Sequence, residues 1–245
     1  MKFSIIICTH NAAKRLSKTL DSILAQTLDD FEVVVVDGAS TDGTQDVIKK
    51  YEEKFGGRLR WISEKDSGVY EAMNRGVKMA KGEYLNVVGA GDWLEPDALE
   101  EAAKCADLHP EADAVFGKTR VWDKDKKSSR LVQTSPEQLP NHPMQHPSLF
   151  YKKNLHDKFG LYDESYRIAG DYAFCLKAFC LGKAKARPFD AVVDNYIMDG
   201  MSSVKPGFCL KENWRARREA GISRRASFRE AIAAAKDNIK KLFQK

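Results

Sequence analysis

The first 110 residues contain four short runs of apolar, largely β-branched residues, and each run is followed by a polar loop and a helical pattern. The runs cover residues 3–8, 31–36, 59–63 and 84–88. Runs of this length and composition are typical of strands buried on both faces of a parallel sheet. In the first helical pattern, Leu16, Leu20 and Leu24 share one face. The alternation predicts right-handed βαβ units, and therefore a mixed, mostly parallel α/β sheet flanked by helices.

The second half of the chain has a different pattern of apolar and polar segments. Residues 114–117 and 130–133 are apolar segments on either side of a lysine-rich turn, which predicts a β-hairpin. A helix is expected from Tyr172 onward. It would place Asp171 at its N-terminus, where the helix dipole favours a carboxylate.

The length and composition support one large domain with an appended segment. The chain has 245 residues, of which 43% are hydrophobic and 31% are charged, so it can bury a sizeable core. We expect a domain over residues 1–205, made of the halves 1–110 and 111–205. Residues 206–245 are expected to form a basic helical tail.

Charge and cysteine pattern exclude several classes of protein. The net charge of +5 comes from dispersed basic residues rather than from one stripe, so no nucleic-acid partner is expected. The five cysteines form no CxxC pair, which argues against a zinc site or a disulfide framework and favours a reducing cytoplasm. The first apolar run is too short for a signal peptide, and no stretch approaches the ~20 apolar residues of a membrane-spanning helix.

Small polar and acidic residues follow the ends of the predicted strands. Thr9 and Asn11 follow the first strand, Asp37 the second and Asp66 the third. Because the carboxyl ends of parallel strands meet along one edge, where open α/β sheets bind ligands, these residues are expected to share a cleft. The two carboxylates can accept hydrogen bonds from a base or ribose, while the backbone near Thr9 can hold a phosphate or a sugar hydroxyl. Together they outline a nucleotide-sized pocket.

Asp92 follows the fourth predicted strand and lies among glycines. A nucleoside diphosphate carries negative charge that a hard divalent cation offsets, and Mg²⁺ or Mn²⁺ typically takes one or two carboxylates and several waters. Gly89 and Gly91 leave room for phosphate oxygens to approach the backbone. Asp92 is therefore the predicted metal ligand.

Six ordered blocks resemble one known family. They are residues 4–11, 22–27, 31–44, 72–76, 80–84 and 91–92. These blocks look like family 2 glycosyltransferases of the GT-A fold, a Rossmann-like fold. The resemblance is dense over residues 3–110, thinner to residue 203 and absent from the tail. It implies a nucleotide-binding half (1–110) and an acceptor-binding half (111–205).

The resemblance implies a metal-dependent hexosyltransferase that moves a sugar from a nucleotide-diphosphate sugar, with a UDP-sugar favoured, to a hydroxyl of a glycan or lipid-linked acceptor with inversion. Asp92 would hold the Mn²⁺ or Mg²⁺, and Asp171 falls where the family places its catalytic base. The donor contacts would be Thr9, Asn11, Asp37, Asp66, Asn74 and Gly91. His146, on the loop before a short apolar run, is a further candidate for touching donor phosphate or acceptor.

Two departures from the family pattern leave fewer acids in the expected site. Gly38 follows Asp37 and Gly91 precedes Asp92, at positions where the family often has a second acid. Two other functions compete with transfer. One is a nucleotidyltransferase that makes sugar nucleotides, although the first loop lacks the glycine-rich, basic character that a triphosphate needs. The other is a non-catalytic nucleotide-sugar binding protein.

The basic tail has three interpretations. It packs on the domain, binds a partner, or lies on anionic lipid as an interfacial helix. Because acceptors of this family are often lipid-linked, the resemblance adds peripheral contact with the inner face of the membrane to a cytoplasmic location. Residues 200–203, rich in small residues, are a candidate for closing over substrate.

Overall fold

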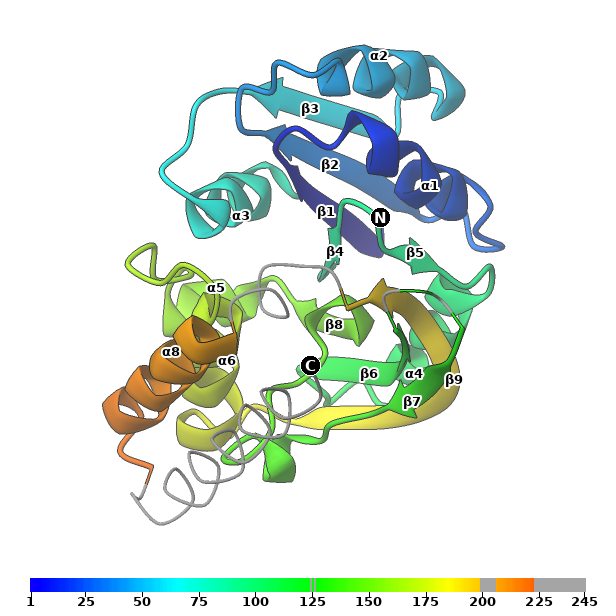
Figure 1. Ribbon diagram of the computed structural model, residues 1–245. Coiled ribbons are helices and arrows are strands. Elements are labelled where there is room, and N and C mark those ends of the chain that lie inside the picture. The colour runs from blue at the N-terminus through cyan, green and yellow to red at the C-terminus, as the bar shows by residue number, and fades with distance from the viewer. Residues whose placement is uncertain (124, 126, 199–205, 223–245) are drawn as a thin grey trace.

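The computed structural model describes residues 1–123, 125, 127–198 and 206–222 (Figure 1). Its strands are β1 (Phe3–Thr9), β2 (Phe31–Asp37), β3 (Leu59–Ser63), β4 (Tyr84–Gly89), β5 (Trp93–Leu94), β6 (Ala114–Trp122), β7 (Ser129–Val132), β8 (Leu149–Lys152) and β9 (Ala186–Ile197). Within the described residues these strands form one sheet in the order β3, β2, β1, β4, β8, β6, β9, β5, with β7 paired to β6. The sheet runs through both predicted halves of the domain.

All pairs among the four strands that were expected from the apolar runs are parallel. β1 pairs with β2 and β4, and β2 pairs with β3, all in parallel, and β6 pairs in parallel with β9. The strands β5, β7 and β8 run antiparallel to their neighbours. A mixed, mostly parallel sheet is therefore confirmed, and so is the hairpin formed by β6 and β7.

Helices cover both faces of the sheet. The helices are α1 (Ala13–Leu24), α2 (Thr44–Lys54), α3 (Val69–Met79), α4 (Ala98–Leu108), α5 (Asn154–Phe159), α6 (Gly170–Cys175) and α8 (Pro206–Glu219). Three short helical segments are added: η1 (Pro136–Gln138) and η2 (His146–Ser148), which are 3₁₀ turns, and the π-helical η3 (Leu176–Leu181). α1, α2 and α4 enclose one core, and α3, α5, α6 and α8 enclose the other.

The apolar runs alternate between these two cores. Ile5 and Ile7 of β1 pack in the core under α1, whereas Ile6 packs in the core under α3, and all three are fully buried. A strand whose two faces are both covered has no polar face, because successive side chains point to opposite sides. This explains why β1 and β2 read as continuous apolar runs.

β9 was not predicted from the sequence, and it positions part of the site described below. It pairs with β6, and its register shifts between Lys118 and Thr119, where Val193 is an extra residue opposite the β6 strand. Such bulges re-aim side chains and are frequent next to functional sites. β5 was also not predicted, and it pairs Trp93 with Asn195 at the far edge.

The first part of the basic tail forms α8, which packs against α6 in the structure (Figure 1). Glu212, Asn213, Ala216 and Arg217 form its buried face. Residues 223–245 of the predicted tail, and the segment 200–203, lie outside the described residues. In the described part of the chain, no helix is long and apolar enough to cross a bilayer.

Candidate active site

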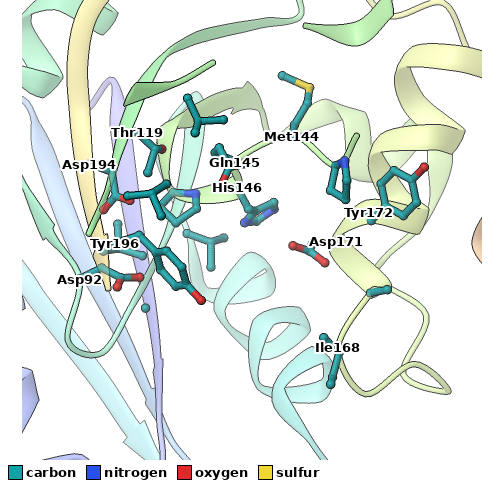
Figure 2. Close-up of a pocket in the computed structure, with 18 of the residues that line it drawn as sticks. Asp92, Thr119, Met144, Gln145, His146, Ile168, Asp171, Tyr172, Asp194 and Tyr196 are labelled. Atoms are coloured by element: carbon teal, nitrogen blue, oxygen red, sulfur yellow. The ribbon is translucent and has the colours of Figure 1, made fainter. Parts of the chain in front are cut away.

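A cavity of about 460 Å³ lies beside the carboxyl end of β4, between β6, β9, η2 and α6. Figure 2 shows Asp92, Asp194 and Tyr196 on one side of it, Asp171 on the opposite side, and His146 between them. The volume is in the range of small-molecule sites. Three residues predicted from sequence, Asp92, His146 and Asp171, therefore meet in one cavity.

A tight turn at the end of β4 presents Asp92. Its backbone N–H donates to the Gly89 carbonyl at 3.0 Å, and Thr19 of α1 holds the turn by accepting the Gly91 N–H at 2.9 Å and donating to the Asp92 carbonyl at 2.7 Å. Gly91 has φ 123°, a conformation that favours glycine. A Cβ on Gly89 would lie 2.6 Å from Oδ2 of Asp92, so this glycine lets the carboxylate fold back over the strand end.

Asp194 of β9 lines the same wall and was not predicted. Its side chain is fully buried, and neither carboxylate oxygen has a hydrogen-bond partner among the described residues. Burial, and secondarily the charge of Asp92, raise the pKa of Asp194 well above its usual range. The nearby backbone N–H of Asn195 partly offsets this rise in pKa, although it does not form a hydrogen bond with the carboxylate. Thr119 of β6 is equally buried, and its hydroxyl also lacks a partner.

Asp171 stands at the N-terminal end of α6 and faces the cavity (Figure 2). The Tyr70 hydroxyl of α3 donates to its Oδ1 at 3.0 Å. The loop that leads into α6 is held by Glu212 of α8, which accepts three backbone N–H groups, from residues 167, 168 and 169, at 2.7 to 3.0 Å. Tyr70 thus orients the carboxylate of Asp171, and Glu212 fixes the backbone that leads to it.

His146 is held by a buried chain of hydrogen bonds. Nδ1 of His156 lies 3.1 Å from the Gly160 carbonyl oxygen, which only accepts, so Nδ1 carries the proton of the neutral ring. Nε2 of His156 then accepts from Tyr151 at 3.1 Å. Tyr151 accepts from Tyr162 at 2.5 Å, and Tyr162 accepts from Nε2 of His146 at 3.0 Å. Burial lowers the pKa of both histidines, so the chain leaves Nδ1 of neutral His146 without a proton.

The other predicted donor contacts gather at the ends of β1, β2 and β3. Thr9 pairs with Asp37 in register, the Gly38 N–H donates to the Thr9 carbonyl at 2.9 Å, and a Cβ on Gly38 would lie 2.6 Å from Oδ2 of Asp66. Asn11, with φ 50°, donates its backbone N–H to a loop serine of the same cluster. Cys8, the residue before Thr9, lines the cavity, so this cluster lies next to it.

The structure gives Asp37 and Asn74 structural contacts. Asp37 is fully buried, and its carboxylate accepts the backbone N–H and hydroxyl of Ser40 and the hydroxyl of Ser63. The Asn74 amide donates to the Tyr162 carbonyl at 2.9 Å and accepts the N–H of the same residue at 2.9 Å. Neither lines the cavity. Their direct contact with a donor stays a prediction.

The residues of the cavity suit a divalent cation that arrives with a diphosphate. Among the described residues, no three His, Cys, Asp or Glu side chains gather into a group that would enclose a metal. Mg²⁺ and Mn²⁺ need no such cage, since one or two carboxylates, waters and substrate phosphates suffice. Asp92 and the unpartnered oxygens of Asp194 share one wall of the cavity, which is the donor set that these hard cations prefer.

Comparison with known proteins agrees with the geometry. Residues 4–170 match the family Glycosyl transferase family 2. The chain belongs to this family. It is 37% identical over 201 residues to a PGL/p-HBAD biosynthesis glycosyltransferase of Mycobacterium bovis, with 79% of this chain and 76% of the relative covered. It is 30% identical over 186 residues to the poly(ribitol-phosphate) beta-N-acetylglucosaminyltransferase TarS of Staphylococcus aureus, covering 73% of this chain but 32% of that protein.

Solved structures share the fold of this family 2 chain. TarS residues 1–349 in complex with UDP superpose with a TM-score of 0.72 and 27% identity, covering 90% of this chain and 65% of TarS 1–349. The mannosyltransferase PcManGT of Pyrobaculum calidifontis, in complex with GDP-Man and Mn²⁺, superposes with a TM-score of 0.71 at 22% identity, covering 89% of this chain and 64% of that one. The predicted GT-A type of fold and the predicted family are thus confirmed.

Sequence reasoning missed the part of the site that β6 and β9 supply. Thr119, Asp194 and Tyr196 line the cavity, but Thr119 lies beyond the predicted apolar segment 114–117, and β9, which pairs with β6, was not predicted. The available signal was the segment 192–197, in which β-branched and aromatic residues surround two polar ones, a composition that suits a strand.

Proposed function

We propose that this family 2 glycosyltransferase is inverting, and that it transfers a sugar from a nucleotide-diphosphate sugar, with a UDP-sugar favoured, to a hydroxyl of a glycan or lipid-linked acceptor. The observation that carries the proposal is the placement of Asp92 and Asp171 on opposite sides of one cavity of about 460 Å³ (Figure 2). One side then receives the diphosphate of the donor and the other receives the attacking hydroxyl.

Asp171 acts as the general base. Tyr70 donates to its Oδ1, which leaves Oδ2 to accept the proton of the acceptor hydroxyl as that oxygen attacks the anomeric carbon. Attack from the side opposite the diphosphate inverts the configuration at that carbon. General-base assistance of this kind typically contributes ~10²- to 10⁴-fold to the rate.

The nucleotide would extend from the Asp92 side of the cavity to the neighbouring ends of β1 and β3. Thr9, Asn11 and Asp66, at the ends of β1 and β3, would contact the nucleoside, and the Gly89–Asp92 turn lets phosphate oxygens approach the backbone. Asp92 would hold Mn²⁺ or Mg²⁺, which when bound offsets the charge that develops on the departing diphosphate. His146 presents an unprotonated Nδ1 that can accept a hydrogen bond from a sugar hydroxyl of donor or acceptor.

Calorimetric titration of UDP and GDP, each with and without Mn²⁺, tests the donor assignment. We expect Mn²⁺-dependent binding of UDP by the wild type and by the surface variant Asp157→Asn, and weak or no binding by Asp92→Asn. Addition of UDP-sugars should release UDP, which a pure binding protein would not do. Failure of both nucleotides to bind, or binding by Asp92→Asn that depends on Mn²⁺ as in the wild type, would overturn the proposal.

The outer face of α8 supports contact of this enzyme with a membrane surface. Phe208 and Trp214 are 44% and 45% exposed on this helix, and Lys211 and Arg218 lie on the same side as Trp214. Exposed aromatic residues beside basic ones suit the interface of an anionic bilayer, where a lipid-linked acceptor would lie. We place the protein on the cytoplasmic side of that surface. Cosedimentation of the full chain with phosphatidylglycerol vesicles but not with phosphatidylcholine vesicles is expected, and Trp214→Glu should reduce it.

A further inference from the structure

Asp194 is an unusual residue for a sheet core. Its side chain is fully buried, yet both carboxylate oxygens lack a hydrogen-bond partner within the described residues. Buried polar groups are normally satisfied, because an unpaired carboxylate in a low-dielectric surrounding is costly. Since Asp194 lines the cavity, its missing partner is expected to come from a ligand.

The register of β9 places Asp194 beside Asp92. The antiparallel pairing of β5 with β9 sets Leu94 opposite Asp194 and Trp93 opposite Asn195, so the residue before β5, Asp92, lies against the same stretch of β9. The bulge at Val193 turns this extra residue into the core under α4 and turns Asp194 to the cavity side. Figure 2 shows the two carboxylates together on one wall.

Thr119 adds a third oxygen to this wall. It is the register partner of Asp194 on β6, it is 1% exposed, and its hydroxyl has no partner among the described residues. Two neighbouring strands thus bring buried, unsatisfied oxygens to the cavity that Asp92 also lines. All three are hard oxygen donors, the kind that Mg²⁺ and Mn²⁺ bind.

Charge decides between the two ligands that such oxygens can bind. A sugar hydroxyl would satisfy one oxygen of Asp194 but would not offset the negative charge of Asp92, which lies on the same wall. A divalent cation interacts favourably with both carboxylates at once and accepts the remaining oxygens as ligands. The arrangement therefore favours the cation.

We propose that Asp194 is a second carboxylate ligand, supported by the Thr119 hydroxyl, for the divalent cation that Asp92 holds. This inference rests on the proposed function, which supplies the diphosphate that completes the coordination. It assigns Asp194 a direct role in metal binding that is separate from proton transfer by Asp171.

Mn²⁺ binding, measured by the electron paramagnetic resonance signal of free Mn²⁺, tests the role of Asp194. Mn²⁺ is titrated into the full chain alone and with UDP, using wild type, Asp194→Asn, Thr119→Val and Asp190→Asn. We expect Asp194→Asn to weaken Mn²⁺ binding at least ~10-fold, the lower end of what even outer-shell partners of metal ligands contribute. Thr119→Val should weaken it less. Asp190 is an exposed carboxylate on the same strand, so Asp190→Asn should bind as the wild type does.

The outcomes separate this inference from the proposed function. If wild-type protein binds Mn²⁺ and UDP together but Asp194→Asn binds Mn²⁺ equally well, the inference is wrong and the donor assignment stands. Loss of UDP-sugar affinity in Asp194→Asn with unchanged Mn²⁺ affinity would instead assign Asp194 to the sugar, which also overturns the inference. Thermal unfolding verifies that each variant folds, and Asp194→Ser gives a smaller substitution if the Asn variant does not.

Discussion

Protonation of His156 is expected to destabilise the folded protein by about 2 kcal/mol between pH 7 and pH 5. The ring is 6% exposed, and burial lowers its pKa from 6.5 to about 4. In the unfolded chain the ring takes up a proton near pH 6.5, whereas the folded protein resists protonation until about pH 4. The unfolded state therefore binds more protons in this window, so the contribution is complete above pH 6.5 and is lost as the pH falls toward 4.

The full difference of about 2.5 pKa units corresponds to about 3 kcal/mol, of which about 2 kcal/mol falls between pH 7 and 5. Urea unfolding at several pH values measures it, with His156→Gln as the variant that cannot titrate. Carboxylates titrate in the same range, so the test is the difference between wild type and His156→Gln. The exposed His142→Gln serves as the matched control. A difference that stays constant from pH 7 to 5 would refute the reasoning.

Two substitutions test how the rest of the chain positions the two acids. The carboxylate of Glu212 accepts the three N–H groups of residues 167–169, which position the loop before Asp171, and the amide of Glu212→Gln cannot accept all three. The substitution should therefore reduce the free energy of unfolding by about 2 kcal/mol, measured by urea unfolding. It should also lower kcat more than it lowers nucleotide affinity. Equal losses in kcat and affinity would contradict this role. Gly89→Ala should leave the melting temperature nearly unchanged but weaken Mn²⁺-dependent binding of UDP, because its Cβ would lie 2.6 Å from Oδ2 of Asp92 and would displace that flexible carboxylate. Unchanged Mn²⁺ dependence would show that the carboxylate has no such role.

The sequence was sufficient for the parallel core because that core obeys simple patterning. Strands such as β1 are covered on both faces, so their apolar runs are continuous and easy to recognise. The turn after β4 could also be predicted, since Asp92 follows an apolar strand and lies among glycines that the geometry of the turn requires. Asp171 was placed by its position at a helix start together with the family resemblance.

β9 escaped prediction because it breaks the same patterning rules. It begins with exposed residues around Asp190 and then buries Asp194, a carboxylate that no strand pattern would place inside. Its role depends on a bulge and on pairing with a strand about 70 residues earlier in the chain, neither of which leaves a local signal. For Asp37, the motif could be recognised in the sequence. Its hydrogen bonds with Ser40 and Ser63 could not be predicted, because they depend on how the loop folds.

The central claim is that Asp171 removes the acceptor proton while the opposite wall binds the donor. Steady-state transfer assays and UDP calorimetry on Asp171→Asn, compared with Asp157→Asn, test it most directly. The account predicts a ~10²- to 10⁴-fold loss of kcat with the Kd for UDP in the presence of Mn²⁺ within about 2-fold of the wild-type value. Turnover close to wild type, or a loss of UDP binding that accounts for the loss of turnover, would contradict it.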